Sequence, residues 1–194
     1  MANWATTTYN ITGKKEDVKE LYELIKSLES GERKPMSEGA DPSWEGNIAL
    51  ALGEDIEGKY LRGFFEYVEF DGEVLTIDAN EAWQVTDLDE ILRSHYEGMR
   101  ILYQSEEWGD EYFVTNDKDQ AVFSTRFAVY SVVDGDHEEE YCDTEEEALQ
   151  YVAGRLERDS ITKEELEKWN DEHEDDNEDE ETNIVRIIAY RIID

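Results

Sequence analysis

The chain is poor in cysteine, proline, histidine and basic residues. Its 194 residues include one cysteine, two prolines and three histidines. The single cysteine, Cys142, excludes an intramolecular disulfide, and the histidines lack zinc-ligand spacing. No apolar run approaches 18 residues, so no membrane-spanning helix is predicted. The N-terminus lacks the basic and apolar segments of a signal peptide. We therefore expect a cytoplasmic protein without metal or cofactor.

Basic residues are scarce relative to acidic ones. There are 18 Lys and Arg against 52 Asp and Glu, a formal net charge of −34. Phosphates would be repelled, so the composition excludes an ordinary nucleic-acid binder and disfavours anionic membranes. Apolar residues still make up 39% of the chain, enough to bury a core. The expected partners are basic protein surfaces or cations.

The acidic residues are concentrated near the C-terminus. From Asp134 to Asn183 there are 23 acidic and 4 basic residues, a net charge of −19. Between Asp171 and Glu181, nine of eleven residues are acidic. Acidic runs of this kind usually form disordered tails. Here the apolar, β-branched segment 184–194 follows, so the run is expected to be a loop held between a helix and a strand.

Hydrophobic periodicity predicts alternating strands and helices. The expected strands cover residues 4–12, 61–70, 73–80, 99–105, 111–115, 121–133 and 184–193. The expected helices cover residues 15–29, 87–97, 145–157 and 163–172. Residues 30–47 are expected to form a long loop, and residues 48–52 fit either a short strand or a helix. Three capping boxes mark helix starts: Thr86 with Asp89, Thr144 with Glu147, and Thr162 with Glu165.

This order of elements predicts an α+β fold with a mainly antiparallel sheet and helices on one face. Strand, helix, strand pair, helix, strand is the ferredoxin-like order. We expect a ferredoxin-like core at residues 1–133. An acidic helix-helix-strand extension at 134–194 is expected to end in a strand that returns to the same sheet, and a single compact domain is the alternative.

Three short motifs carry a family resemblance. Asn3-Trp4 opens a polar strand that ends in Thr12-Gly13, "ANEAW" at 79–83 precedes a short helix, and "YQSEEWGDEYF" at 103–113 supplies an aromatic strand pair. Together they resemble the Api-like family of phage- and plasmid-borne proteins over roughly residues 2–130. The resemblance implies a ferredoxin-like core and a mobile-element origin. It implies no catalytic residues, because the family has no established activity.

Catalytic motifs are not found. Carboxylates crowd Cys142, and their charge is expected to raise the pKa of its thiol and make it less reactive. There is no glycine-rich phosphate loop and no G-x-S-x-G. Two acidic segments fail the glycine requirement of an EF-hand. We expect a protein that is not an enzyme, although a buried cleft with strongly shifted carboxylate pKa values would favour one.

Carboxylates at fixed helical spacing can imitate a nucleic-acid backbone. The hypothesis is a nucleic-acid-mimicking inhibitor, of anti-CRISPR or anti-restriction type, that occupies the basic channel of a defence nuclease in the bacterial host. The expected contact residues are Glu145, Glu146, Glu164, Glu165, Asp171, Glu172, Asp175, Asp176, Asp179 and Glu180. Trp44 is a candidate aromatic anchor, although packing that pins its loop also fits. The alternatives are an acidic structural or cation-binding protein and an uncharacterised enzyme.

Overall fold

The computed structural model describes residues 3–173 and 183–193, which form two compact units. The first unit runs to Val122 and includes Ile192 and Ile193, and the second covers Phe123–Arg191. The fold is α+β, with mostly antiparallel sheets and five helices among the described residues. Each unit has a hydrophobic core of its own.

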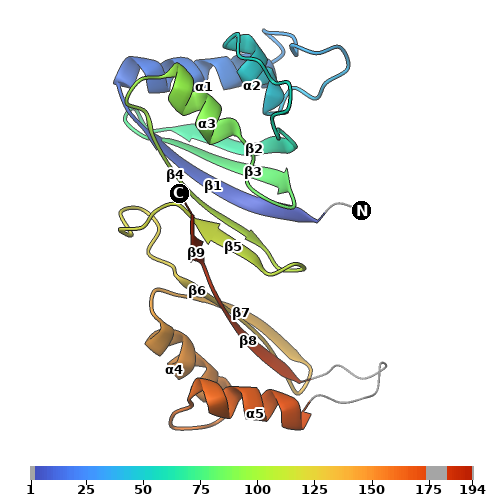
Figure 1. Cartoon of the computed structure of the whole chain (residues 1–194), viewed down its shortest axis with the longest axis vertical. Coiled ribbons are helices and arrows are strands. Elements are labelled where there is room, and N and C mark those ends of the chain that lie inside the picture. The colour runs from blue at the N-terminus through green and yellow to red at the C-terminus, as the bar shows by residue number, and fades with distance from the viewer. Residues whose placement is uncertain (1–2, 174–182, 194) are drawn as a thin grey trace. The chain divides into compact units, whose positions relative to one another are not determined.

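A six-stranded sheet forms the first unit, with the strand order β2-β3-β1-β4-β5-β9. The strands are β1 Trp4–Thr12, β2 Gly63–Phe70, β3 Leu75–Ala82, β4 Arg100–Glu107, β5 Tyr112–Thr115 and β9 Arg191–Ile192. Strand β1 lies between β3 and β4 and is antiparallel to both. The helices are α1 Lys15–Glu29, α2 Gly46–Ala51 and α3 Leu88–His95. All three pack on the same face of the sheet (Figure 1).

Alternation along β1 decides which side chains face those helices. Its buried positions are Ala5, Thr7, Tyr9 and Ile11, whereas Trp4 on the opposite face is 47% exposed. Successive side chains of a strand point to opposite faces, so a single register buries all four. Two of the four are polar, which places hydroxyl groups in the interior beside the helices.

The predicted elements of the first unit are largely confirmed. Strand β1 and helix α1 have the predicted bounds, and the ambiguous segment at 48–52 belongs to helix α2. The capping box at Thr86 is wrong, because Asp87 is the N-cap residue of α3 and makes no side-chain cap. The Thr86 hydroxyl instead donates a hydrogen bond to Glu45 at 2.6 Å. Thr86 therefore bonds to a residue distant in the sequence, Glu45, and does not form the predicted capping box with Asp89.

The second unit is a three-stranded sheet covered by two helices (Figure 1). Its elements are β6 Phe127–Val133, β7 Asp136–Cys142, α4 Glu145–Arg155, α5 Lys163–His173 and β8 Ile184–Ala189, with the strand order β7-β6-β8. The capping box of Thr144 with Glu147 is confirmed. Thr162 and Glu165 also exchange both hydrogen bonds of a capping box, at 2.8 and 3.2 Å.

Three strand predictions in this part of the chain need correction. The strand expected from residue 121 begins at Phe127, and the acidic strand β7 was not predicted. The hairpin turn between β6 and β7 is Asp134-Gly135, whose positive φ angles of 52° and 78° suit a type I′ turn. The expected final strand does not return whole to the main sheet. Strand β8 pairs with β6, and only the two-residue β9 joins the first sheet, next to β5.

Two glycines provide a matched test of packing. A Cβ atom at Gly46 would overlap the Trp44 ring, whereas one at Gly154 in α4 would meet no atom of the described residues within 4 Å. Gly46→Ala is expected to lower the free energy of unfolding by about 1–3 kcal/mol through overpacking. Gly154→Ala is expected to raise it by about 0.5–1 kcal/mol, because alanine favours the helix. Urea titrations of both variants measure this, and equal effects would contradict the packing of Trp44.

Candidate functional site

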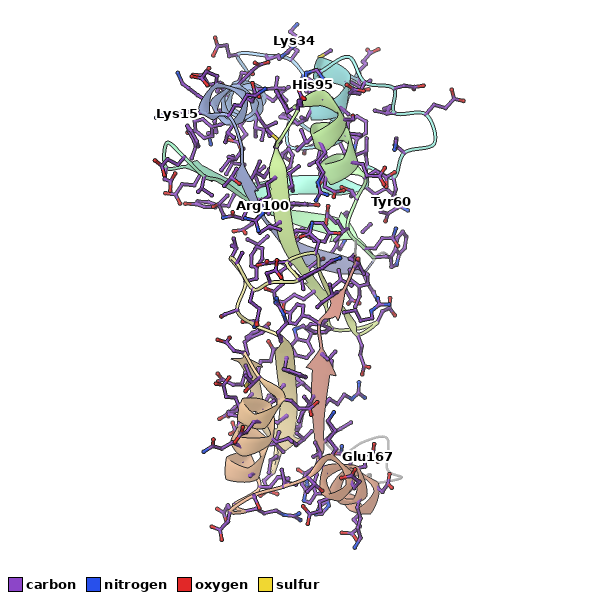
Figure 2. The ribbon with its side chains drawn as sticks, turned by 60° about the vertical axis from the view of Figure 1, so that its left-hand side comes forward. Lys15, Lys34, Tyr60, His95, Arg100 and Glu167 are labelled. Atoms are coloured by element: carbon purple, nitrogen blue, oxygen red, sulfur yellow. The ribbon has the colours of Figure 1, made fainter. Side chains whose placement is uncertain are left out.

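Three acidic side chains of the second unit form a stripe along α5. Glu164, Glu167 and Asp171 are spaced three and four residues apart, so their side chains lie on one helical face. All three are exposed. Figure 2 shows Glu167 on this helix. Among the described residues, none of these three carboxylates has a cationic partner. We call Glu164, Glu167 and Asp171 the α5 stripe.

The other predicted carboxylates on described residues are more engaged. Glu145 forms an ion pair with Lys163 at 2.5 Å, and Glu172 forms one with Lys168 at 3.4 Å. Glu165 is occupied in the capping box of α5. Glu146 is exposed and has no ion pair within the described part of the chain. The predicted face is therefore a mixture of free and internally neutralised carboxylates.

Four predicted contact residues lie outside the described residues. These are Asp175, Asp176, Asp179 and Glu180. The stripe ends just before this segment, at Asp171, and β8 begins just after it, at Ile184.

A cavity of about 420 Å³ lies beside the acidic surface of the second unit. Leu149 and Ile161 supply apolar side chains, and Glu145, Glu146 and Asp159 supply carboxylates. Gln150 and Ser160 complete the lining. A cavity with apolar and acidic walls suits a long basic side chain, whose methylene stem is apolar and whose head is cationic.

Trp44 is a packing residue in the first unit. Its indole N–H donates to the Leu61 carbonyl at 2.7 Å, and its backbone forms an isolated bridge with Phe64. Together with the fit over Gly46, these contacts pin the long loop to the edge strand β2. Trp44 also lines a cavity together with Trp4. A role for Trp44 as an anchor for a partner stays a prediction.

A buried pair of carboxyl groups lies in the first unit, where the sequence indicated none. Glu45, just before α2, and Glu81, on the inner face of β3, are both fully buried. The Thr86 hydroxyl lies between them, 2.6 Å from Glu45 and 2.9 Å from Glu81. Gly63 makes room for the pair, since a Cβ atom there would overlap the Glu45 carboxyl.

The two carboxyl groups have unequal surroundings. Glu81 accepts hydrogen bonds from the Tyr9 hydroxyl at 2.6 Å, from the Thr86 amide at 3.1 Å and from the Thr7 hydroxyl. For Glu45, the Oε1 atom has no hydrogen-bond partner among the described residues. Donors stabilise a carboxylate and an unpartnered charge does not. We therefore assign the negative charge to Glu81 and a proton to Glu45.

The pKa values support this assignment. Burial, followed by the charge of Glu81, raises the pKa of Glu45 well above its ordinary value. Burial also raises the pKa of Glu81, but the hydrogen bonds from Thr7, Tyr9 and Thr86 lower it again. The same burial and the nearby Glu81 charge raise the pKa of Tyr9, which keeps its hydroxyl a donor.

This pair bears on the enzyme alternative. Shifted carboxylates in a cleft are typical of acid–base catalysts. Both side chains are fully buried, and neither lines the cavities of about 440 and 510 Å³ described in the first unit. Substrate could not reach them without an opening of the loop before α2. The arrangement suits a structural role in holding that loop to the sheet.

The remaining chemical candidate is the thiol of Cys142. It is buried at the end of β7. Burial raises its pKa, and the charges of Glu140, Glu147 and Asp143 raise it further. The raised pKa agrees with the expected effect of the carboxylates and has burial as its larger cause, and poor reactivity of this thiol stays a prediction.

No protein-family model, curated protein or solved structure matches this chain. Across residues 3–173 and 183–193, no group of three or more histidine, cysteine, aspartate or glutamate side chains is arranged to hold a metal ion. Within the same residues, none of the helices has the length and apolarity needed to span a membrane.

Proposed function

We propose that this chain is a non-enzymatic inhibitor that presents carboxylates in place of nucleic-acid phosphates. Its target is the basic nucleic-acid-binding surface of a defence nuclease. The α5 stripe is the observation that carries the proposal, because its three exposed carboxylates are fixed on a helix and not neutralised by described residues. Fixed like charges destabilise a fold. Their presence on this helix therefore supports a functional role for the charge.

The charge density of the stripe is comparable to that of a DNA strand. The step from Glu164 to Asp171 is seven residues, or about 10.5 Å of helix at 1.5 Å per residue. One DNA strand carries a phosphate about every 3.4 Å along its axis. Three carboxylates over about 10.5 Å thus approach the spacing that a basic channel accommodates.

The cavity beside Glu145 and Glu146 supports the same type of partner. Its carboxylates can accept hydrogen bonds from a guanidinium or ammonium group, and Leu149 and Ile161 can pack against the methylene stem. Lys163 already forms an ion pair with Glu145 at 2.5 Å, so a lysine of the chain itself uses one of these carboxylates. A lysine or arginine of the partner would bind in a similar way.

We also propose that the first unit is a ferredoxin-like scaffold. Strand β1 lies between β3 and β4, β2 lies beyond β3, and helices α1 and α3 follow β1 and β3 in the chain. This order agrees with a split β-α-β arrangement. With the resemblance to Api-like proteins, it supports an origin on a phage or plasmid and a place of action in the cytoplasm of the bacterial host.

The proposal is tested by affinity capture from bacterial cells that carry restriction or CRISPR systems. Immobilised chain is expected to retain a nucleic-acid-binding protein at about 50 mM salt and to release it at about 500 mM, because screening weakens complementary charge. Retention of no such protein at low salt would refute the inhibitor role. In that case an acidic structural or cation-binding protein becomes the better description.

A further inference from the structure

Tryptophans gather at one end of the first sheet. Trp4 opens β1, Trp83 follows β3 and Trp108 follows β4, and the antiparallel register brings these strand ends together. Trp44 joins them through its bridge to Phe64 at the start of β2. Four of the five tryptophans of the chain therefore lie at this end. Trp4 and Trp83 remain 47% and 41% exposed, more than core packing explains.

A cavity of about 510 Å³ lies among these aromatic side chains. Its lining consists of Trp4, Trp44, Ile56, Lys59, Leu61, Arg62 and Phe64. The Trp4 and Phe64 rings are 5.9 Å apart between centroids and tilted by 58°. Sites for small ligands have volumes of about 300–1,000 Å³, mostly apolar walls and a few polar groups. This cavity has the size and the lining of such a site.

Two charged side chains line the cavity, Lys59 and Arg62, and both are cationic. Lys59 forms an ion pair with Glu90 at 3.0 Å. The Arg62 guanidinium lies 4.6 Å from the centroid of the Trp83 ring, and within the described part of the chain no carboxylate forms an ion pair with it. The chain has a net charge of −34. An exposed arginine without a described carboxylate partner makes the charge at this aromatic cavity locally positive.

The backbone at Trp83 is strained in a way that fixes this arrangement. Its φ angle is 65°, in the left-handed region that tryptophan rarely adopts. Its N–H donates to the Asn3 carbonyl at 2.8 Å, which holds the turn against the start of β1. Strain of this kind persists where the surroundings impose it, and it clusters at ligand sites. Here it places the indole beneath the Arg62 guanidinium.

We propose that this cavity binds a small molecule with a planar aromatic ring and one anionic group. The ring of the ligand stacks among Trp4, Trp44 and Phe64, and its anionic group pairs with Arg62. The ligand chemistry is shared by aromatic carboxylates and by nucleoside monophosphates. The site lies in the first unit and is independent of the proposed inhibitor function, which uses carboxylates of the second unit.

Titration calorimetry of the full chain tests the proposal with two matched ligand pairs. Indole-3-acetate is compared with its neutral amide, and adenosine monophosphate is compared with adenosine. One of the two anions is expected to bind saturably, with a Kd of about 1 mM or tighter, as for a ligand of this size. Its neutral partner is expected to bind roughly tenfold more weakly. The pair that responds identifies the source of the ligand.

Two variants assign the site. Arg62→Gln is expected to reduce the affinity for the anion roughly tenfold and to leave the neutral ligand unchanged. Arg100→Gln is the control, because Arg100, which Figure 2 labels, is exposed and lines a different cavity of the first unit. Equal binding of anion and neutral partner to the native chain would overturn the proposal. So would no saturation by either anion below about 10 mM, or an equal loss of affinity in both variants.

Discussion

Glu45→Gln is expected to make the chain more stable than the native protein at alkaline pH. In the folded chain burial and the Glu81 charge raise the pKa of Glu45, whereas the unfolded chain titrates it near its ordinary value of 4.5. Between those two pKa values the folded state binds more protons, so the free energy of unfolding falls as pH rises. Its slope reaches about 1.4 kcal/mol per pH unit for one proton. Glutamine removes this proton and keeps the shape of the side chain.

Glu81→Gln should have the opposite effect. The Glu81 carboxylate accepts hydrogen bonds from Thr7, Tyr9 and Thr86, and an amide nitrogen in its place can accept none. Hydrogen bonds to a charged group contribute about 1.5–3 kcal/mol each, and unsatisfied buried donors add a cost. We expect a loss of about 2–4 kcal/mol at neutral pH.

Urea titrations of the native chain and both variants at about pH 5, 7 and 9 measure these effects. The many exposed carboxylates also destabilise the folded chain as pH rises, through repulsion. That contribution is common to all three proteins. The relevant quantity is therefore the difference in the free energy of unfolding between the native chain and Glu45→Gln. Besides burial, the charges of Glu45 and Glu81 also raise the pKa values of Tyr9 and Tyr60, so these two hydroxyls are the other titratable groups coupled to the pair. A difference between native chain and Glu45→Gln that does not change with pH would show that Glu45 carries no buried proton.

Neutralisation of the α5 stripe is expected to weaken partner binding by about 10- to 100-fold. The variant combines Glu164→Gln, Glu167→Gln and Asp171→Asn. Each exposed ion pair contributes about 0.5–1 kcal/mol, and three together give about 1.5–3 kcal/mol, which corresponds to that change in Kd. The fold should be preserved, because these side chains are exposed and make no described ion pair.

The matched control removes the same number of charges from a helix of the first unit. Glu16, Glu20 and Glu23 on α1 are also exposed and spaced four and three residues apart. Their replacement by glutamine changes the net charge equally and is expected to alter Kd less than twofold, because these carboxylates are not part of the proposed contact surface and salt screens charges that make no direct contact. Affinities measured by titration calorimetry compare the two variants. Equal losses would indicate an effect of net charge rather than a contact surface.

Local periodicity was sufficient to predict most helices and strands. The apolar stripe of α1 and the alternation of β1 encode their own bounds, and the capping boxes at Thr144 and Thr162 depend on residues three apart. Strand β7 was missed because its residues are mostly acidic and its stability comes from pairing with β6. The Asp134-Gly135 turn was the available signal for this hairpin.

The buried carboxyl pair could be predicted only in part. Leu75, Ile77, Ala79 and Glu81 share the inner face of β3, but the strand was predicted to end at residue 80, and only its extension by one residue would have placed Glu81 inside. Nothing comparable marks Glu45, which is brought to Glu81 by the course of the loop before α2. The exposed acidic stripe, in contrast, follows from helical spacing alone, and its predicted residues on α5 are exposed in the structure.

The central claim is that the acidic surface occupies the position of a nucleic acid on its partner. Competition between the chain and fluorescently labelled duplex DNA for the captured nuclease tests it most directly, with fluorescence anisotropy as the readout. Mimicry predicts that the native chain displaces the DNA completely, with an apparent affinity that weakens as salt increases. The α5 stripe variant should require about 10- to 100-fold more protein for the same displacement. Formation of a ternary complex of nuclease, DNA and chain would contradict the account.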